Sequence, residues 1–166
     1  DDVLPTLIEG VASANGFKPG QIVVHSSGRY GISVLAPAIL QGAHAIALHP
    51  AMTFVGTEND VERLQSCPFA VTTTEAATAI GQALVYELGG EPHVIAEVDR
   101  VRYHAALAHG ANHLTTLIAQ SLTMLSEIGI ERPAEFISPL VFASTENVLR
   151  HGMTALTGPI SRGDTE

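Results

Sequence analysis

The protein has 166 residues, of which 46% are hydrophobic and 15% charged, so it is long enough to bury a core and is predicted to be a soluble globular protein. Its formal net charge of −9, with only 8 lysine and arginine residues, argues against a nucleic-acid partner. No run approaches the ~18 apolar residues of a membrane span, and we expect a cytoplasmic protein without membrane contact. The single cysteine, Cys67, excludes an intrachain disulfide.

The first fifty residues carry the pattern of a helix followed by a strand, a helix and a strand. These elements are expected at residues 3–11, 21–25, 32–40 and 43–50. A strand, a helix and a strand within about 30 residues form a βαβ unit, which implies a parallel sheet. Ligands of such sheets bind beyond the carboxyl ends of the strands, and those ends are His25 to Gly28 and His49 with Pro50.

The next segment continues the α/β pattern to residue 96. Asn59 and Glu62 match a capping box for a short helix at residues 60–65. A strand, a helix and a further strand are expected at residues 69–73, 75–88 and 93–96. We therefore expect residues 1–96 to be α/β and residues 97–166 to be all-helical.

Residues 97–128 predict one long helix, because the segment has no proline and a single internal glycine. One face of it carries residues at near i, i+4 spacing, namely His104, Ala108, Asn112, Thr115 and Ala119. An imidazole and a carboxamide beside small side chains leave room for a ligand. The alternative is a groove where another helix packs, with both polar groups satisfied in a core. Further on, Ser138 and Pro139 are expected to break a helix that begins at Pro133.

Several motifs that would indicate a particular cofactor or reaction are absent from the sequence. Neither a G-x-G-x-x-G loop nor a P-loop occurs, and neither does a G-x-S-x-G elbow or an HExxH pair. His109 and His113 lie at i, i+4 spacing without a carboxylate at ligand distance on the same face. Two histidines alone are a weak signal for zinc, and we expect no metal site.

Four segments, taken in order along the chain, form a recognisable set: VVHSSG at 23–28, LHPAMTFVG at 48–56, EVDRVRYHAALAHGANHLTTL at 97–117 and ALTGPISRGD at 155–164. Together they resemble the Rossmann-like proteins with a C-terminal helical domain in the 6-phosphogluconate dehydrogenase-like superfamily. Its members include ketopantoate reductase, pyrroline-5-carboxylate reductase and prephenate dehydrogenase. The resemblance implies that residues 1–96 are the remainder of a Rossmann-like dinucleotide-binding domain, with the C-terminal part of its parallel sheet. Residues 97–166 would be a helical domain for dimerisation and substrate binding.

The same resemblance implies a role for particular residues. The catalytic residues would be His49, His104 and Asn112. The cofactor, NADP or NAD, would be bound by His25, Ser26, Ser27, Gly28 and Pro50. The substrate would be bound by Thr53, Tyr103, Gly158, Arg162 and Asp164. The sequence departs from the pattern at Ala108, where the hydroxyacid dehydrogenases of this superfamily carry a lysine.

We therefore expect an NAD(P)-dependent oxidoreductase for a small hydroxy, keto or imino acid, represented here by a fragment without the glycine-rich loop. That fragment alone is expected to bind the dinucleotide weakly. One alternative is a non-catalytic ligand-binding or scaffold protein that retains the dehydrogenase fold. A cofactor-free hydrolase or lyase is a third hypothesis, and no nucleophile and base at a known spacing support it. We also expect a homodimer formed through residues beyond Glu97.

Overall fold

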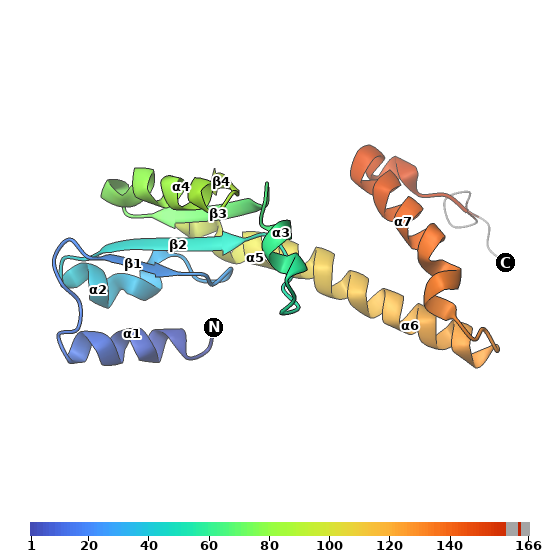
Figure 1. Ribbon diagram of the computed structural model, residues 1–166, viewed down its shortest axis with the longest axis horizontal. Coiled ribbons are helices and arrows are strands. Elements are labelled where there is room, and N and C mark those ends of the chain that lie inside the picture. Colours follow the sequence, from blue (N-terminus) through green and yellow to red (C-terminus); the bar gives the residue numbers. More distant parts are fainter. Residues whose placement is uncertain (159–162, 164–166) are drawn as a thin grey trace. The chain divides into compact units, whose positions relative to one another are not determined.

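The computed structural model describes residues 1–158 and 163 (Figure 1). Its contacts divide the chain into two compact units, Asp1–Gly110 and Ala111–Glu166. The first unit is α/β and the second is helical, so the predicted fold class is confirmed. The expected domain boundary after Ala96 marks the start of the long helix, and the first compact unit continues through Gly110.

A four-stranded sheet forms the centre of the first unit. Its strands, in spatial order, are β1 (Ile22–His25), β2 (His44–Pro50), β3 (Pro68–Thr73) and β4 (Glu91–Val94). The β1–β2 and β3–β4 pairs are parallel, as the βαβ pattern predicts for the first pair, but β2 and β3 are antiparallel. The expectation of a wholly parallel sheet was therefore wrong at that pair. The segment between Pro50 and Pro68 holds only α3 (Asn59–Arg63), which is too short to cross the sheet, so β3 starts where β2 ends.

Helices cover both faces of this sheet (Figure 1). One face carries α1 (Leu4–Ser13), η1 (Ile32–Leu35) and α2 (Ala36–Leu40), and the other carries α4 (Thr78–Glu87), which follows the short η2 (Glu75–Ala77). Successive residues of β2 serve opposite faces, because side chains alternate along a strand. Ala45 packs with Ile8 and Leu35 under α1, whereas Ile46 packs with Val85 under α4. Each fully buried side chain of the size of Leu35, Ile46 or Val85 contributes about 1.5–3 kcal/mol to folding.

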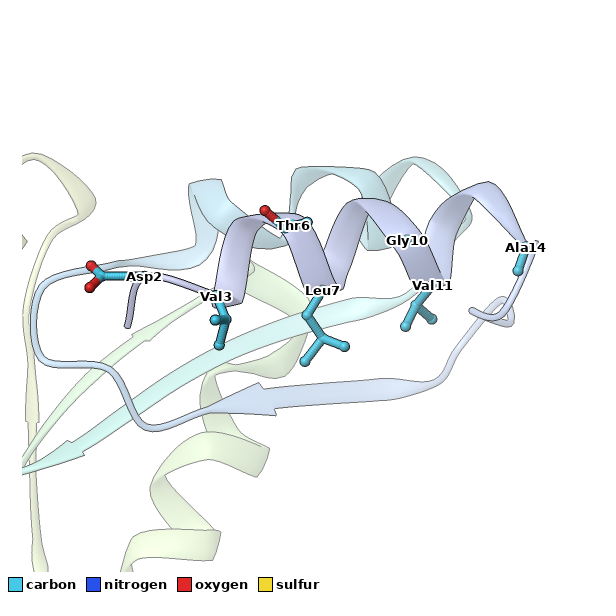
Figure 2. A pocket seen from close by; sticks show the side chains of 7 residues that line it. All are labelled: Asp2, Val3, Thr6, Leu7, Gly10, Val11 and Ala14. Carbon is cyan, nitrogen blue, oxygen red and sulfur yellow. The ribbon is translucent and has the colours of Figure 1, made fainter.

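The side of α1 that faces away from this core is also apolar. Figure 2 shows the residues that line a shallow groove along it: Asp2, Val3, Thr6, Leu7, Gly10, Val11 and Ala14. Val3 is 74% exposed and Leu7 is 58% exposed, while Ile8 on the opposite side is buried. The helix therefore has apolar residues on two sides.

The loop between β2 and α3 is organised by Asp60 rather than by a capping box. Asp60 is buried, and its Oδ2 accepts hydrogen bonds from the backbone N–H groups of Val55 and Gly56, each at 2.8 Å. Glu58 is the N-cap residue of α3, and its side chain makes no capping hydrogen bond. The predicted box between Asn59 and Glu62 was therefore wrong, because the loop donors precede the helix and Asp60 is the carboxylate that meets them.

The long helix that the sequence predicts is present. It is built from η3 (Glu97–Asp99), α5 (Arg100–Ala108), a π-helical turn η4 (His109–His113) and α6 (Leu114–Glu127). A π turn takes more residues than an α turn, so it interrupts i, i+4 spacing within residues 109–113. The prediction that Asn112 shares a helix face with His104 assumed an uninterrupted α-helix, and the π turn lies between these two residues and includes Asn112.

The last long helix, α7 (Pro133–His151), runs through Pro139, so the predicted break at Ser138-Pro139 was wrong. A proline removes one backbone hydrogen bond, and the hydroxyl of Ser138 donates to the carbonyl of Ala134 one turn earlier. The short η5 (Gly152–Ala155) follows. Across the described residues, no helix combines the length and the hydropathy that a bilayer span requires.

Candidate active site

The loop after β1 is held in one conformation by its own side chains. The Nε2 atom of His25 lies 2.8 Å from the carbonyl oxygen of Gly31, and its Nδ1 accepts a hydrogen bond of 3.2 Å from the N–H of Ser27. The hydroxyl oxygen of Ser27 accepts from the N–H of Tyr30. Because Nδ1 of His25 accepts a hydrogen bond, the ring is neutral, and burial lowers its pKa below the ordinary value. His25 and Ser27 therefore shape the loop.

The first turn of the long helix binds the backbone of the same loop with two side chains. The carboxylate of Glu97 accepts hydrogen bonds of 2.7 Å from the N–H of Ile32 and 3.0 Å from the N–H of Ser33, at the start of η1. The guanidinium of Arg100 donates to the carbonyl oxygens of Ser27 at 2.7 Å and Tyr30 at 3.1 Å. Glu97 therefore binds backbone N–H groups of residues 27–33, and Arg100 binds backbone carbonyl groups of the same segment.

Arg100 is 1% exposed and also donates to the carbonyl of Ala70 on β3, at 3.4 Å. Among the described residues no carboxylate lies within 4 Å of its guanidinium, so its charge is balanced by backbone dipoles and by Glu97 at longer range. Its guanidinium carbon lies 5.6 Å from the centre of the Tyr103 ring. A buried cation thus lies next to the aromatic residue one turn further along α5.

Tyr103 links α5 to the end of β2. Its hydroxyl is 2.8 Å from Nδ1 of His49, and the two rings meet edge to face with centroids 5.7 Å apart. Burial, followed by the charges of Arg100 and His104, lowers the pKa of His49 to about 4. Burial raises the pKa of Tyr103. At neutral pH the pair is therefore an uncharged imidazole and an uncharged phenol.

His104 completes the group. Its ring centre is 6.3 Å from that of His49, and its Nδ1 is buried without a hydrogen-bond partner in the described structure. Gly28 lies against both rings: a Cβ atom there would be 2.7 Å from Nε2 of His49 and 2.8 Å from Nδ1 of His104. Both nitrogens therefore face the same small space, which exists because residue 28 has no side chain.

A second feature lies at the same strand ends on the opposite face of β2. Consecutive residues of a strand point to opposite faces, so Pro50 lines an apolar groove while His49 faces α5. The groove is formed by Val24, His25, Ser26, Leu48, Pro50, Phe54, Leu64, Phe69 and Leu88. Ser26 and Pro50, which were predicted to bind a cofactor, line this groove, whereas His49 and His104 face the space at Gly28.

The structure brings together four residues that the sequence analysis proposed, His49, Tyr103, His104 and Gly28. Thr53 is exposed in the loop after β2. Asn112 and Gly158 belong to the second unit, so their predicted roles beside His104 stay predictions. Arg162 and Asp164 lie outside the described residues.

Sequence analysis assigned no role in the site to Glu97 or Arg100. Their targets are backbone groups 30 to 73 residues earlier in the chain, and a backbone group leaves no trace in a sequence pattern. The sequence held one indication of their role: Glu97 and Arg100 are three residues apart, on the turn just before Tyr103 and His104. The four residues therefore lie on neighbouring turns of one helix.

Comparisons with known proteins give two family matches. A sequence-family model described as a Rossmann-like domain matches residues 1–50, and one described as a domain of unknown function (DUF2520) matches residues 67–166. A search among curated proteins finds no match.

Several solved structures have a similar fold. A protein from Thermotoga maritima superposes with a TM-score of 0.69 at 22% identity, over 94% of this chain and 72% of its own. A proposed NADP oxidoreductase from Bacteroides fragilis gives 0.78 at 20%, over 99% and 61%. The NADP-bound pyrroline carboxylate reductase of Plasmodium falciparum gives 0.62 at 11%, over 99% and 63%. The chain thus spans about three fifths to three quarters of the length of these proteins.

Proposed function

The chain belongs to the family described as a domain of unknown function (DUF2520), and on that premise we propose that the whole protein is an oxidoreductase using NADP or NAD. The resemblance to the 6-phosphogluconate dehydrogenase-like superfamily and the Rossmann-like match over residues 1–50 support a nicotinamide cofactor. The proposed substrate is a small molecule with a hydroxy, keto or imino group.

The residues present fit such a cofactor. Gly28 follows a parallel strand, and open α/β sheets bind ligands beyond the carboxyl ends of their strands. A Cβ atom at this position would fill the space that both imidazoles face, and Nδ1 of His104 is buried there without a partner. The backbone at Gly28 would hold the reactive end of the dinucleotide, which, when bound, accepts or supplies a hydride.

The chain's own side chains then position the substrate and move a proton. His49, uncharged at neutral pH, is oriented by Tyr103 and presents Nε2 towards Gly28. His104 presents a nitrogen that has no hydrogen-bond partner among the residues that the structure describes. Groups of this kind can hold a substrate oxygen or nitrogen and take up or release its proton during hydride transfer. The observation that carries the proposal is the convergence of His49 and His104, from β2 and α5, on Gly28.

The test uses the whole protein and follows nicotinamide absorbance with a panel of small alcohols, ketones and imines. We expect His104→Ala to lower turnover at least about 100-fold, the typical contribution of a general acid or base, with little change in melting temperature. His93→Ala, on an exposed position of β4, is the matched control and should retain activity.

Two results would contradict the proposal. One is full turnover in His104→Ala, which would remove that ring from the chemistry. The other is the absence of hydride transfer with every substrate in the panel although the whole protein binds NADPH. That second result would favour a ligand-binding protein that retains the fold, a hypothesis consistent with Ala108 in the place of the lysine.

A further inference from the structure

The hydrogen bond between Tyr103 and His49 defines what His49 can offer to a ligand. The phenol is protonated at neutral pH, because burial raises the pKa of Tyr103, and its only hydrogen-bond contact in the described structure is Nδ1 of His49. We assign the hydroxyl as the donor in this bond, because an Nδ1–H donor on His49 would leave the buried phenol proton without an acceptor among the described residues. The ring proton of His49 must then be on Nε2, the atom that faces Gly28. His49 therefore presents a hydrogen-bond donor.

His104 presents the complementary group at the same place. Its Nδ1 is buried and unpartnered, and a buried polar atom of this kind costs about 1–3 kcal/mol unless a ligand or water satisfies it. A neutral imidazole can supply one donor and one acceptor nitrogen. With a donor already provided by His49, an accepting Nδ1 of His104 gives a pair that matches a hydroxyl group, which accepts one hydrogen bond and donates another.

The charge around this pair of histidines disfavours a positively charged ligand. Arg100 is a buried cation stacked near Tyr103, and its charge disfavours a second positive charge on His49. The other ionisable groups that act on these residues are His104, Cys67 and Glu97, and the carboxylate of Glu97 is held by two backbone N–H groups of η1. A protonated amine or an iminium has no lone pair with which to accept from Nε2–H of His49, and it would place a positive charge against the ring whose own protonation Arg100 disfavours.

We propose that the site formed by His49, His104 and Gly28 takes the oxygen of a hydroxyl and carbonyl couple, and that it rejects the corresponding amine and imine couple. The inference rests on the proposed function and narrows its substrate class. In the oxidation, the O–H bond breaks and its proton goes to Nδ1 of His104. The C–H bond at the carbon that bears the hydroxyl also breaks, and a bound oxidised nicotinamide would accept its hydrogen as a hydride. A C=O bond forms, and its oxygen accepts from Nε2–H of His49. In the reverse direction His104 returns the proton.

The first test reads the protons directly. Long-range ¹H–¹⁵N NMR of the whole protein at pH 7 should show His49 as the neutral Nε2–H tautomer and His104 with an unprotonated Nδ1. In Tyr103→Phe the O–H donor is lost, so His49 should become a mixture of tautomers. His93→Asn, at an exposed site, should leave both spectra unchanged. An Nδ1–H tautomer of His49, or a protonated Nδ1 on His104, would overturn the proposal.

The second test compares ligands that differ in one group. The probes are pairs with the same carbon skeleton, a set of 2-hydroxy acids and the corresponding 2-amino acids, added to the whole protein with oxidised cofactor. The hydroxy member should shift the ¹⁵N resonance of Nδ1 in His104, and its kcat/KM should exceed that of the amine by at least about 100-fold, because sites built for a particular polar group discriminate by this much or more. The amine should leave the resonance in place.

The two tests separate the inference from the function on which it rests. A shift of the His104 resonance by hydroxy compounds without any hydride transfer would contradict the oxidoreductase and support the hydroxyl site. Turnover that favours the amines would support the oxidoreductase and overturn the hydroxyl site. No response of His104 to any hydroxy compound would also overturn it.

Discussion

Gly28 is the residue at which the absence of a side chain has a direct chemical consequence. A methyl group there would lie under 3 Å from ring nitrogens of both His49 and His104, closer than any unstrained contact. His49 cannot turn away freely, because its other nitrogen is bonded to Tyr103. Gly28 does not have a positive φ, so the backbone conformation does not require a glycine at this position. The reason for a glycine here is the space that the two imidazoles share.

We predict that Gly28→Ala in the whole protein lowers kcat/KM at least about tenfold, while the protein remains folded with a modest loss of stability, within about 1–3 kcal/mol for an overpacked site. The matched control is Gly10→Ala in α1, where a Cβ atom meets nothing within 4 Å. This control should gain up to about 1 kcal/mol from helix propensity and keep its activity. Thermal melts and steady-state kinetics of both variants decide the matter, and equal activity in Gly28→Ala would show that the rings do not need that space.

At the scale of elements, the site depends on how the long helix begins. Glu97 and Arg100 join its first turn to η1 and to the loop after β1, and Arg100 also reaches β3. Tyr103 and His104 follow on the next turn, so the same helix that fixes the loop supplies His104, which faces Gly28, and Tyr103, which is hydrogen-bonded to His49. Three separate segments are thereby held in a single geometry by two charged side chains.

We predict that Arg100→Met destabilises the protein by at least about 3 kcal/mol, because three buried or half-buried carbonyls lose a charged donor. Glu97→Ala should cost about 1–2 kcal/mol, as for the loss of a helix cap. Arg102→Met, on an exposed position of the same helix, should stay within about 0.5 kcal/mol of the parent. Urea titration of the three variants measures these differences. Equal stability of the Arg100 and Arg102 variants would refute the anchoring role.

For the molecule as a whole, the main feature of the second unit is its exposed apolar surface. None of the residues described in α6 and α7 is buried, and large apolar side chains are widely exposed: Leu117, Met124, Phe136, Leu140, Phe142 and Leu149. A groove within this unit is lined by Ser121, Met124, Leu125, Phe136, Ile137 and Leu140. We expect exposed apolar surface on this scale to be an interface, because a monomer rarely leaves such patches in water.

We predict that a second copy of the chain covers this surface in a homodimer. A symmetric contact buries the same groove on both copies, and obligate interfaces of this kind bury about 2,000 Å² or more. Light scattering at micromolar concentration should give twice the chain mass of 17.4 kDa. The double variant Phe136→Asp with Leu140→Asp should dissociate the dimer. The control Val98→Asp, at a position that is 86% exposed in the first unit, should not. A monomeric parent protein would contradict the interface.

The sequence by itself determined the features that depend on near neighbours along the chain. Alternating and 3.6-residue apolar patterns identified β1, β2 and the long helix, since each pattern is set by residues a few positions apart. The βαβ spacing also located His25 to Gly28 and His49 at adjacent strand ends, because the right-handed crossover leaves few alternatives. Those parts of the candidate site could therefore be predicted without coordinates.

How these pieces meet is seen only in the folded chain. The antiparallel direction of β3 depends on where an irregular segment of the chain turns, which periodicity does not encode. The continuation of α7 through Pro139 reflects the cooperativity of a 19-residue helix, which tolerates the loss of one backbone bond. The bonds from Glu97 to Ile32 and from Arg100 to Ser27 span 65 and 73 residues. Their targets are backbone atoms, which every residue possesses, so only the folded chain shows which of them the two side chains bind.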